Sequence, residues 1–262
     1  MVKFIHITDT HFVPPGELLY GLNPIDRLAL CVADVNRSHS DAAFAILTGD
    51  LAHKGQPEAY AALKRELDKL AIPYHLLVGN HDDRGNFHDA FPAVRFDENG
   101  FVQYTLEIGE GVLGICLDTN EPGKPWGTFC EKRAAWLKAT LDKAGDRPVI
   151  IFIHHPPFKV RLRRMDDISL LEPQHFIKAI EGRTNIRHMF FGHLHRPVAG
   201  SWRGIPISTL RATSHQVALD FVIEGRIPGS HEPPAYGVCL LEADQMIVHL
   251  HDYLDRTHTF LL

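Results

Sequence analysis

Short apolar runs rich in β-branched residues recur along this chain, and they constrain its fold more than any other feature. They occupy residues 2–8, 43–48, 74–78, 112–117, 149–153 and 186–191, and their length and composition are typical of buried β-strands. Helical patterns lie between them. One begins at Asn23-Pro24, another begins at Pro57, and a third ends before Gly145. This alternation predicts a layered α/β fold with sheet inside and helices outside.

The length and composition set the expected domain organisation. A chain of 262 residues with 45% hydrophobic residues can bury a substantial core. We expect one domain over residues 1–262. Within it, residues 217–235 are rich in Gly, Pro and charge, and we expect them to form a small cap or an oligomerisation loop. Residues 236–254 contain two apolar segments around a Glu-Ala-Asp-Gln turn, which predicts a terminal hairpin.

The net charge and the cysteine pattern argue against several classes of protein. A formal charge of −5 gives no basic surface for duplex nucleic acid, so a small molecule is the better partner. No run reaches the roughly 18 apolar residues of a membrane helix, and the N-terminus lacks the apolar core of a signal peptide. Four scattered cysteines without C-x-x-C spacing disfavour a zinc ribbon or a disulfide framework. We expect a cytoplasmic protein with no membrane partner. The sequence is compatible with a monomer and with a homo-oligomer.

All but one of the predicted strands end in residues that can bind metals. These residues are Asp9 and His11, Asp50, Asn80 and His81, His154 and His155, and His193 and His195. Each cluster alone could be an ordinary turn or strand cap, but ordinary turns would also draw on Ser, Lys and Gly. Ligands in open α/β sheets bind at the carboxyl ends of strands. We therefore expect the five clusters to converge on one site.

The order of these motifs resembles that of a known family. The series D-x-H, G-D, G-N-H-D, H and G-H-x-H is similar to that of the calcineurin-like metallophosphoesterases. More narrowly, "TDTHF", "LYG", "TGDLAHKG", "VGNHDDR", "FIHHPP", "FGHLH" and "STL…SHQV" resemble the class III cyclic nucleotide phosphodiesterases, and most of all their glycerophosphodiesterase branch. The resemblance covers residues 1 to 216. It implies a layered sandwich of two central β-sheets flanked by helices.

The resemblance also implies a centre of two divalent or mixed-valence transition metal ions, of Mn, Fe, Zn or Co. One metal would be held by Asp9, His11, Asp50 and His195, and the other by Asp50, Asn80, His154 and His193. Asp50 would bridge them and would thereby be essential to catalysis. The metals would bind phosphate oxygens and lower the pKa of a water, and the resulting hydroxide would attack phosphorus. Because Asn80 is neutral, the centre stays cationic for an anionic diester.

Other residues receive supporting roles from the same resemblance. His81 is placed near the leaving group, where it can donate a proton, and it is expected to contact the substrate together with Asn80. His215 and Tyr20 are expected to line the substrate pocket. The sequence has Arg211 where the family pattern has a Pro-Gly pair, which leaves the pocket wall undefined. Asp82 and His155 are interpreted as supports, with Asp82 orienting a neighbouring histidine.

These residues predict a dinuclear-metal hydrolase of small phosphodiesters. The Gly-Asp motif continues as "GDLAHKG" and so lacks the Asp-Arg-Gly that phosphoprotein phosphatases have at this place, and the chain has no G-x-S-x-G, Walker A or H-E-x-x-H motif. Glycerophosphodiesters are favoured as substrates, with 3′,5′- or 2′,3′-cyclic AMP as the alternative. A noncatalytic metal-binding module is the alternative of a different class. A nuclease would require a basic groove, which this acidic chain does not supply.

Overall fold

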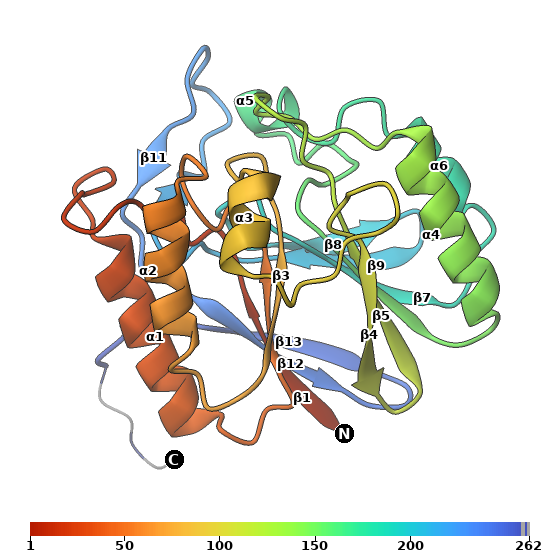
Figure 1. The fold of residues 1–262 in the computed structure, drawn as a ribbon, viewed down its shortest axis with the longest axis horizontal. Coiled ribbons are helices and arrows are strands. Elements are labelled where there is room, and N and C mark those ends of the chain that lie inside the picture. Colours follow the sequence, from red (N-terminus) through yellow and green to blue (C-terminus); the bar gives the residue numbers. More distant parts are fainter. Residues whose placement is uncertain (258–259, 261–262) are drawn as a thin grey trace.

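The computed structural model describes residues 1–257 and 260. Over these residues the chain forms two mixed β-sheets and a short two-stranded ribbon. Helices lie on the outer side of each sheet, with α1 and α2 beside one and α4 and α6 beside the other (Figure 1). The expected sandwich of two sheets flanked by helices is confirmed. No helix within the described residues is long and apolar enough to span a membrane.

The first sheet has parallel strands in its centre and an antiparallel hairpin at one edge. Its spatial order is β13 (Met246–His251), β12 (Tyr236–Leu241), β1 (Val2–Ile7), β2 (Ala45–Thr48) and β3 (Tyr74–Leu77). β1, β2 and β3 run parallel, so their carboxyl ends lie at the same edge. β12 and β13 are the predicted terminal hairpin.

The second sheet also has a parallel centre. Its order is β4 (Tyr104–Gly109), β5 (Val112–Leu117), β6 (Val149–Ile153), β7 (Ile186–Phe191), β9 (Ile205–Thr209) and β8 (Val198–Trp202). β5, β6 and β7 are parallel neighbours and are buried along most of their length. The carboxyl ends of these strands therefore form a second edge from which loops can reach the site.

The longer helices begin and end where the sequence indicates. The helices are α1 (Pro24–Ser38), α2 (Pro57–Leu67), α3 (Arg84–Ala90), α4 (Glu131–Ala144), α5 (Arg163–Asp166) and α6 (Gln174–Ile180). The Asn23 side chain caps α1 by accepting from the amide of Ile25. Gly145 follows α4 with φ of 59°, a conformation that glycine adopts without steric cost.

An aromatic cluster joins the two sheets beneath the polar loops. Phe4 of β1 packs edge-on against Phe152 of β6 and Phe190 of β7, with ring centroids 6.0 Å and 5.6 Å away. Phe152 and Phe190 stack at 5.3 Å. All three side chains are fully buried, and aromatic pairs of this kind stabilise by about 0.5–1.5 kcal/mol beyond the area they bury. This packing fixes one sheet against the other and thereby positions their loops.

The segment that sequence analysis interpreted as a cap or oligomerisation loop is anchored at both ends. β10 (Gln216–Val217) pairs antiparallel with β11 (Gly229–Ser230), so residues 218–228 form the loop of a short ribbon. Arg196 holds this ribbon through hydrogen bonds to the carbonyl of Val217 (2.7 Å) and to Glu232 (3.1 Å). In Figure 1 the ribbon and α5 lie at the end of the molecule opposite both termini.

Candidate metal centre

The residues predicted as metal ligands lie together between the loops that follow β1, β2, β3, β6 and β7. Asp9, His11, Asp50 and His195 form the first group, and all four are buried. His11 Nε2 lies 2.9 Å from His195 Nε2 and 3.5 Å from Asp50 Oδ2. The metal-binding atoms of the four residues lie within 4.8 Å of one another. Two imidazoles and two carboxylates are a donor set that suits Mn, Fe, Co or Zn.

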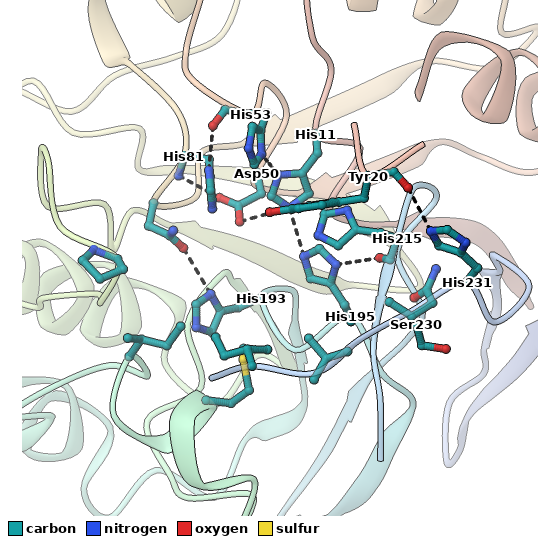
Figure 2. A pocket seen from close by; sticks show the side chains of 18 residues that line it. His11, Tyr20, Asp50, His53, His81, His193, His195, His215, Ser230 and His231 are labelled. Carbon is teal, nitrogen blue, oxygen red and sulfur yellow. Dashed lines mark hydrogen bonds and ion pairs between the residues drawn. The ribbon is translucent and has the colours of Figure 1, made fainter. Parts of the chain in front are cut away.

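The remaining ligand candidates form a second group on the other side of Asp50. His154 Nε2 lies 3.4 Å from Asp50 Oδ1, and Asn80 Oδ1 lies 3.1 Å from His193 Nδ1. Because Asp50 turns Oδ2 toward His11 and Oδ1 toward His154, this carboxylate stands between the two groups. This is the position that a bridging ligand requires. Figure 2 shows Asp50 above His193 and His195, with His81 beside it.

The backbone is strained at five of the seven ligand candidates. A positive φ is found at Asp9 (53°), His11 (45°), Asp50 (50°), His193 (67°) and His195 (47°). Non-glycine residues rarely adopt this conformation, and each such residue costs of order 1–3 kcal/mol unless its surroundings hold it. Strained residues of this kind cluster at functional sites. Such a concentration at one place is therefore an independent indication of function.

The glycines beside the ligand candidates allow the loops to approach closely. A Cβ at Gly49 would lie 2.6 Å from His154 Nδ1, and a Cβ at Gly79 would lie 2.5 Å from the amide nitrogen of Asp50. Both distances are too short for any side chain. The glycines of the Gly-Asp and Gly-Asn motifs are thus required by the packing of these loops, in addition to any turn they make.

Hydrogen bonds orient the imidazoles of His154 and His195 so that Nε2 of each ring faces the centre. His154 Nδ1 donates to the carbonyl of Thr48 at 2.7 Å, and His195 Nδ1 donates to the carbonyl of His215 at 2.8 Å. When Nδ1 carries the proton of a neutral imidazole, Nε2 has a free lone pair. Both Nε2 atoms point toward Asp50 or Asp9. The rings are therefore fixed in the orientation that a metal ligand needs.

The electrostatics favour charged carboxylates paired with imidazoles. Burial alone would raise the pKa of Asp50, but His154 and other imidazoles hold that pKa well below its usual value. Burial lowers and Asp50 raises the pKa of His154, with a net value of about 9. His195 has a raised pKa because Asp9 outweighs its burial. Burial and the charge of His154 lower the pKa of His193 to about 3. In the metal-free protein, protons on His154 and His195 thus supply part of the positive charge that metal ions would supply.

The residues present fit a metal centre. His193 Nε2 is buried and has no hydrogen-bond partner in the part of the chain that the structure describes, and the buried His154 Nε2 has only a 3.4 Å contact with Asp50 Oδ1. Leaving a buried polar atom unpaired costs about 1–3 kcal/mol. The two facing nitrogens of His11 and His195, beside the Asp50 carboxylate, likewise converge on a point where a cation would satisfy all of them.

Comparison with known proteins identifies the family. The sequence profile described as calcineurin-like phosphoesterase matches residues 2–197. The chain belongs to this family. Calcineurin-like phosphoesterases use a dinuclear metal centre, which agrees with the two groups of ligand candidates around Asp50. The matched residues include all of these candidates, from Asp9 to His195.

Relatives of this phosphoesterase carry names that describe phosphodiesterases. A probable cyclic nucleotide phosphodiesterase of Rhodopseudomonas palustris is 47% identical over 95% of this chain and 91% of its own length. The glycerophosphodiester phosphodiesterase of Enterobacter lignolyticus is 32% identical over 81% of this chain and 77% of its own length. A dimetal phosphatase from Danio rerio has the same fold, with a TM-score of 0.72, 16% identity and 97% coverage of both chains.

Asp9 of this phosphoesterase is held by a buried chain of hydrogen bonds. His6 Nε2 donates to Thr48 Oγ1 (2.8 Å), Thr48 Oγ1 donates to Thr8 Oγ1 (2.8 Å), and Thr8 Oγ1 donates to Asp9 Oδ2 (2.6 Å). The amide of His193 also donates to the Asp9 carboxylate, at 3.1 Å. Each donor in this series of hydrogen bonds points toward the carboxylate, so the series holds Asp9 in place.

The Asp82 carboxylate is a loop brace, but it does not orient a histidine. It accepts hydrogen bonds from the amides of Leu51 (3.1 Å), Ala52 (3.0 Å) and Gly79 (2.8 Å), and from the hydroxyl of Tyr60 (2.8 Å). The interpretation of Asp82 as a loop brace is confirmed, whereas the expectation that it orients a neighbouring histidine was wrong. Asp82 instead ties the loop after β2 to the loop after β3, because backbone amides are the donors nearest to it. Burial and the charge of Asp50 raise the pKa of Asp82 to about 6.

Further supports come from the end of β5, which the sequence analysis passed over. Thr119 Oγ1 lies 2.7 Å from His155 Nδ1, and His155 Nε2 lies 3.1 Å from Asn80 Oδ1. His155 is thereby a support for Asn80, as interpreted from the sequence. Asn120 donates to the carbonyl of Asp82 at 2.8 Å. The sequence did contain a signal for these supports, because Asp118-Thr119-Asn120 directly follows a predicted strand. The cluster was passed over because it contains no histidine.

A cavity of about 650 Å³ opens above the metal centre. Its lining includes His81, His215 and Tyr20, as the resemblance implied, and also His53, which sequence reasoning missed. The His53 ring stacks on His81 at 4.8 Å, and the His53 carbonyl accepts from His81 Nδ1 at 2.6 Å. Figure 2 shows these side chains around the cavity. The signal for His53 was its place in "GDLAHKG", three residues after Asp50.

Arg211, the residue that departs from the family pattern, contributes to structure and does not line the cavity. Its guanidinium donates to Asp252 at 2.7 Å and lies 3.7 Å from Glu232. Glu232 in turn pairs with Arg196. Arg211 therefore holds the β11 segment against the C-terminal strand, while the neighbouring His215 faces the substrate space.

Metal binding by the apoprotein is expected to release protons at neutral pH, about one of them from His154. With a pKa of about 9, His154 carries a proton at pH 7 that it must lose to become a ligand. The apparent metal affinity should consequently rise with pH up to about 9 and level off above it. Calorimetric titration with Mn²⁺ in two buffers of different ionisation enthalpy measures this release. Equal heats in both buffers would contradict the protonated state of His154.

Proposed function

We propose that this metal-dependent phosphoric diester hydrolase acts on small phosphodiesters and that Asp50 bridges its two metals. The observation that carries the proposal is the position of the Asp50 carboxylate, with one oxygen toward His11 and the other toward His154. When bound, two divalent cations would neutralise phosphate charge and lower the pKa of the attacking water. The pair would be held by Asp9, His11, Asp50 and His195 on one side and by Asp50, Asn80, His154 and His193 on the other.

His81 is assigned to the leaving oxygen. Its backbone amide donates to Asp50 Oδ1 at 2.9 Å, which fixes the backbone, and its Nδ1 donates to the His53 carbonyl at 2.6 Å, which fixes the ring. Because Nδ1 donates to this carbonyl, Nε2 is the ring nitrogen left to carry the proton of a general acid. That proton can pass to the departing alkoxide. The stacking of His53 on His81 restricts the same ring further.

Two substrate classes are to be compared. The motif resemblance favours glycerophosphodiesters, and the relative from Enterobacter lignolyticus carries that name at 32% identity. Cyclic nucleotides are favoured by the higher identity of 47% to the probable cyclic nucleotide phosphodiesterase of Rhodopseudomonas palustris. Both classes are small anionic diesters that can enter a cavity of about 650 Å³.

The proposal is tested by a substrate panel on protein reconstituted separately with Mn, Fe, Co and Zn. The panel contains bis(p-nitrophenyl) phosphate, glycerophosphocholine, glycerophosphoethanolamine, 3′,5′- and 2′,3′-cyclic AMP, and phosphomonoesters. We expect metal-dependent hydrolysis of diesters with kcat/KM well above that for monoesters. Metal-loaded protein that is inert toward every diester would favour the noncatalytic metal-binding module instead.

A further inference from the structure

The cavity above the metal centre has two chemically different sides. One side carries the imidazole, carboxylate and amide groups of the centre. The other side is apolar and is formed by Met165, Ile168, Val217 and Ile227. The first two come from α5 and the residues after it, and the others come from β10 and the loop of the ribbon. We call this apolar part of the lining the apolar wall.

The apolar wall is built into the fold. Met165 and Val217 belong to a buried cluster that also contains Leu162 and Leu194. Leu194 lies between the ligand candidates His193 and His195 in the sequence, so the cluster links the wall directly to the metal centre. Such contacts fix the distance between wall and centre.

Polar contacts hold the outer part of the wall. His231, just after β11, is hydrogen-bonded through Nε2 to the carbonyl of Tyr20 at 3.0 Å, and Figure 2 shows this contact at the edge of the cavity. Arg196 binds the carbonyl of Val217 on the other strand of the ribbon. Both ends of the loop that carries Ile227 are therefore tied to residues beside the centre.

The lining carries almost no charge of its own. Among the cavity-lining residues that the structure describes, Asp50 is the only Asp, Glu, Lys or Arg, and its carboxylate faces the ligand histidines. A charged substituent on the substrate would lose water without gaining an ion pair, which is unfavourable.

Tyr20 and His215 offer flat aromatic surfaces, with ring centroids 4.6 Å apart. Planar uncharged groups can pack on such rings and on aliphatic side chains.

We propose that the apolar wall selects phosphodiesters whose retained substituent, the group that stays on phosphorus, contains an uncharged planar ring. Ile227 is the specificity-determining residue of this wall, because it lines the cavity yet is 41% exposed and is thus placed at the mouth. The inference rests on the proposed phosphodiesterase function and deepens it by naming the retained group. Small hydrophilic or cationic groups, such as choline, are accepted poorly.

The test compares p-nitrophenyl esters that share one leaving group and differ in the retained substituent. The four substrates are bis(p-nitrophenyl) phosphate, thymidine 5′-(p-nitrophenyl) phosphate, methyl p-nitrophenyl phosphate and p-nitrophenylphosphorylcholine. Values of kcat/KM on Mn²⁺-loaded protein are divided by the uncatalysed rate of each ester. We expect the aryl and thymidine esters to exceed the methyl and choline esters by about 10-fold or more, the scale that apolar pocket contacts supply. The aryl and thymidine arms distinguish a simple ring from a nucleoside base.

A matched pair of variants assigns the preference to the wall. Ile227→Glu places a carboxylate at the cavity, and it should raise the choline-to-aryl ratio by about 10-fold. Val222→Glu makes the same kind of change in the same loop, but Val222 is 79% exposed and does not line the cavity. We expect Val222→Glu to leave the ratio unchanged. Because both positions are exposed, neither variant should disturb folding.

The outcomes separate the inference from the proposed function. Turnover of all four esters at similar normalised rates, or a preference for the choline ester, would overturn the inference and leave the phosphodiesterase function intact. An equal shift in both variants would also overturn it, since the effect would then come from net charge. If none of the four esters is turned over, the proposed function and the inference are both contradicted.

Discussion

Replacing Asp50 by alanine is expected to lower kcat at least about 1,000-fold and to reduce the bound metal at both sites. The carboxylate faces His11 with one oxygen and His154 with the other, so its removal takes a ligand from each group. It also removes the anion that offsets repulsion between two cations. A loss of several kcal/mol in charge stabilisation corresponds to a rate factor of about 10³ or more. Elemental analysis and kcat on bis(p-nitrophenyl) phosphate measure the two effects.

Asp50→Asn is the matched control for this variant. The amide keeps the volume and one oxygen of the side chain but removes its charge, so metal content and kcat should lie between wild type and Asp50→Ala. Thermal unfolding of both variants checks that the fold persists. Two tightly bound metals and normal turnover in Asp50→Ala would refute the shared ligand.

His81→Ala is expected to affect substrates unequally. A departing alkoxide needs a proton in the transition state, whereas p-nitrophenolate disperses its own charge. Positioned acid catalysis contributes about 10²–10⁴-fold, so we expect a loss of that order on whichever alkyl diester the wild type hydrolyses best. The loss on bis(p-nitrophenyl) phosphate should be distinctly smaller. Metal content should be unchanged, and kcat/KM is measured for both substrates at matched metal loading.

His215→Ala provides the comparison for His81. His215 lines the same cavity and packs beside Tyr20, so its loss should impair both substrates by similar factors through binding. Equal losses in His81→Ala would assign His81 to phosphate binding or to the architecture of the site. Loss of metal in that variant would make it a structural support, since its amide contacts Asp50.

Much of the fold could be predicted because buried strands carry a strong local signal. The strands at 112–117, 149–153 and 186–191 agree with β5, β6 and β7 to the residue. β4 (Tyr104–Gly109) was missed because its alternating pattern is short and ends in glycine. β10 and β11 could not be found, since each has two residues and is defined only by pairing with the other.

The ligand candidates could be predicted to cluster for a related reason. Parallel strands bring their carboxyl ends to one edge, so Asp9, Asp50 and Asn80 converge wherever β1, β2 and β3 are neighbours. The supporting contacts follow no such rule. Thr8–Thr48 and Thr119–His155 are hydrogen-bonded pairs between neighbouring strands of one sheet, so these partners depend on the strand order, which the local sequence does not give.

The sharpest test of the dinuclear centre is anomalous X-ray diffraction from crystals grown with Mn²⁺, with kcat measured on the same preparation. We predict two anomalous peaks on opposite sides of the Asp50 carboxylate, one beside His11 and His195 and the other beside His154 and His193, in protein that hydrolyses phosphodiesters. A single peak, peaks away from these residues, or full activity in metal-free protein would contradict a two-metal centre bridged by Asp50.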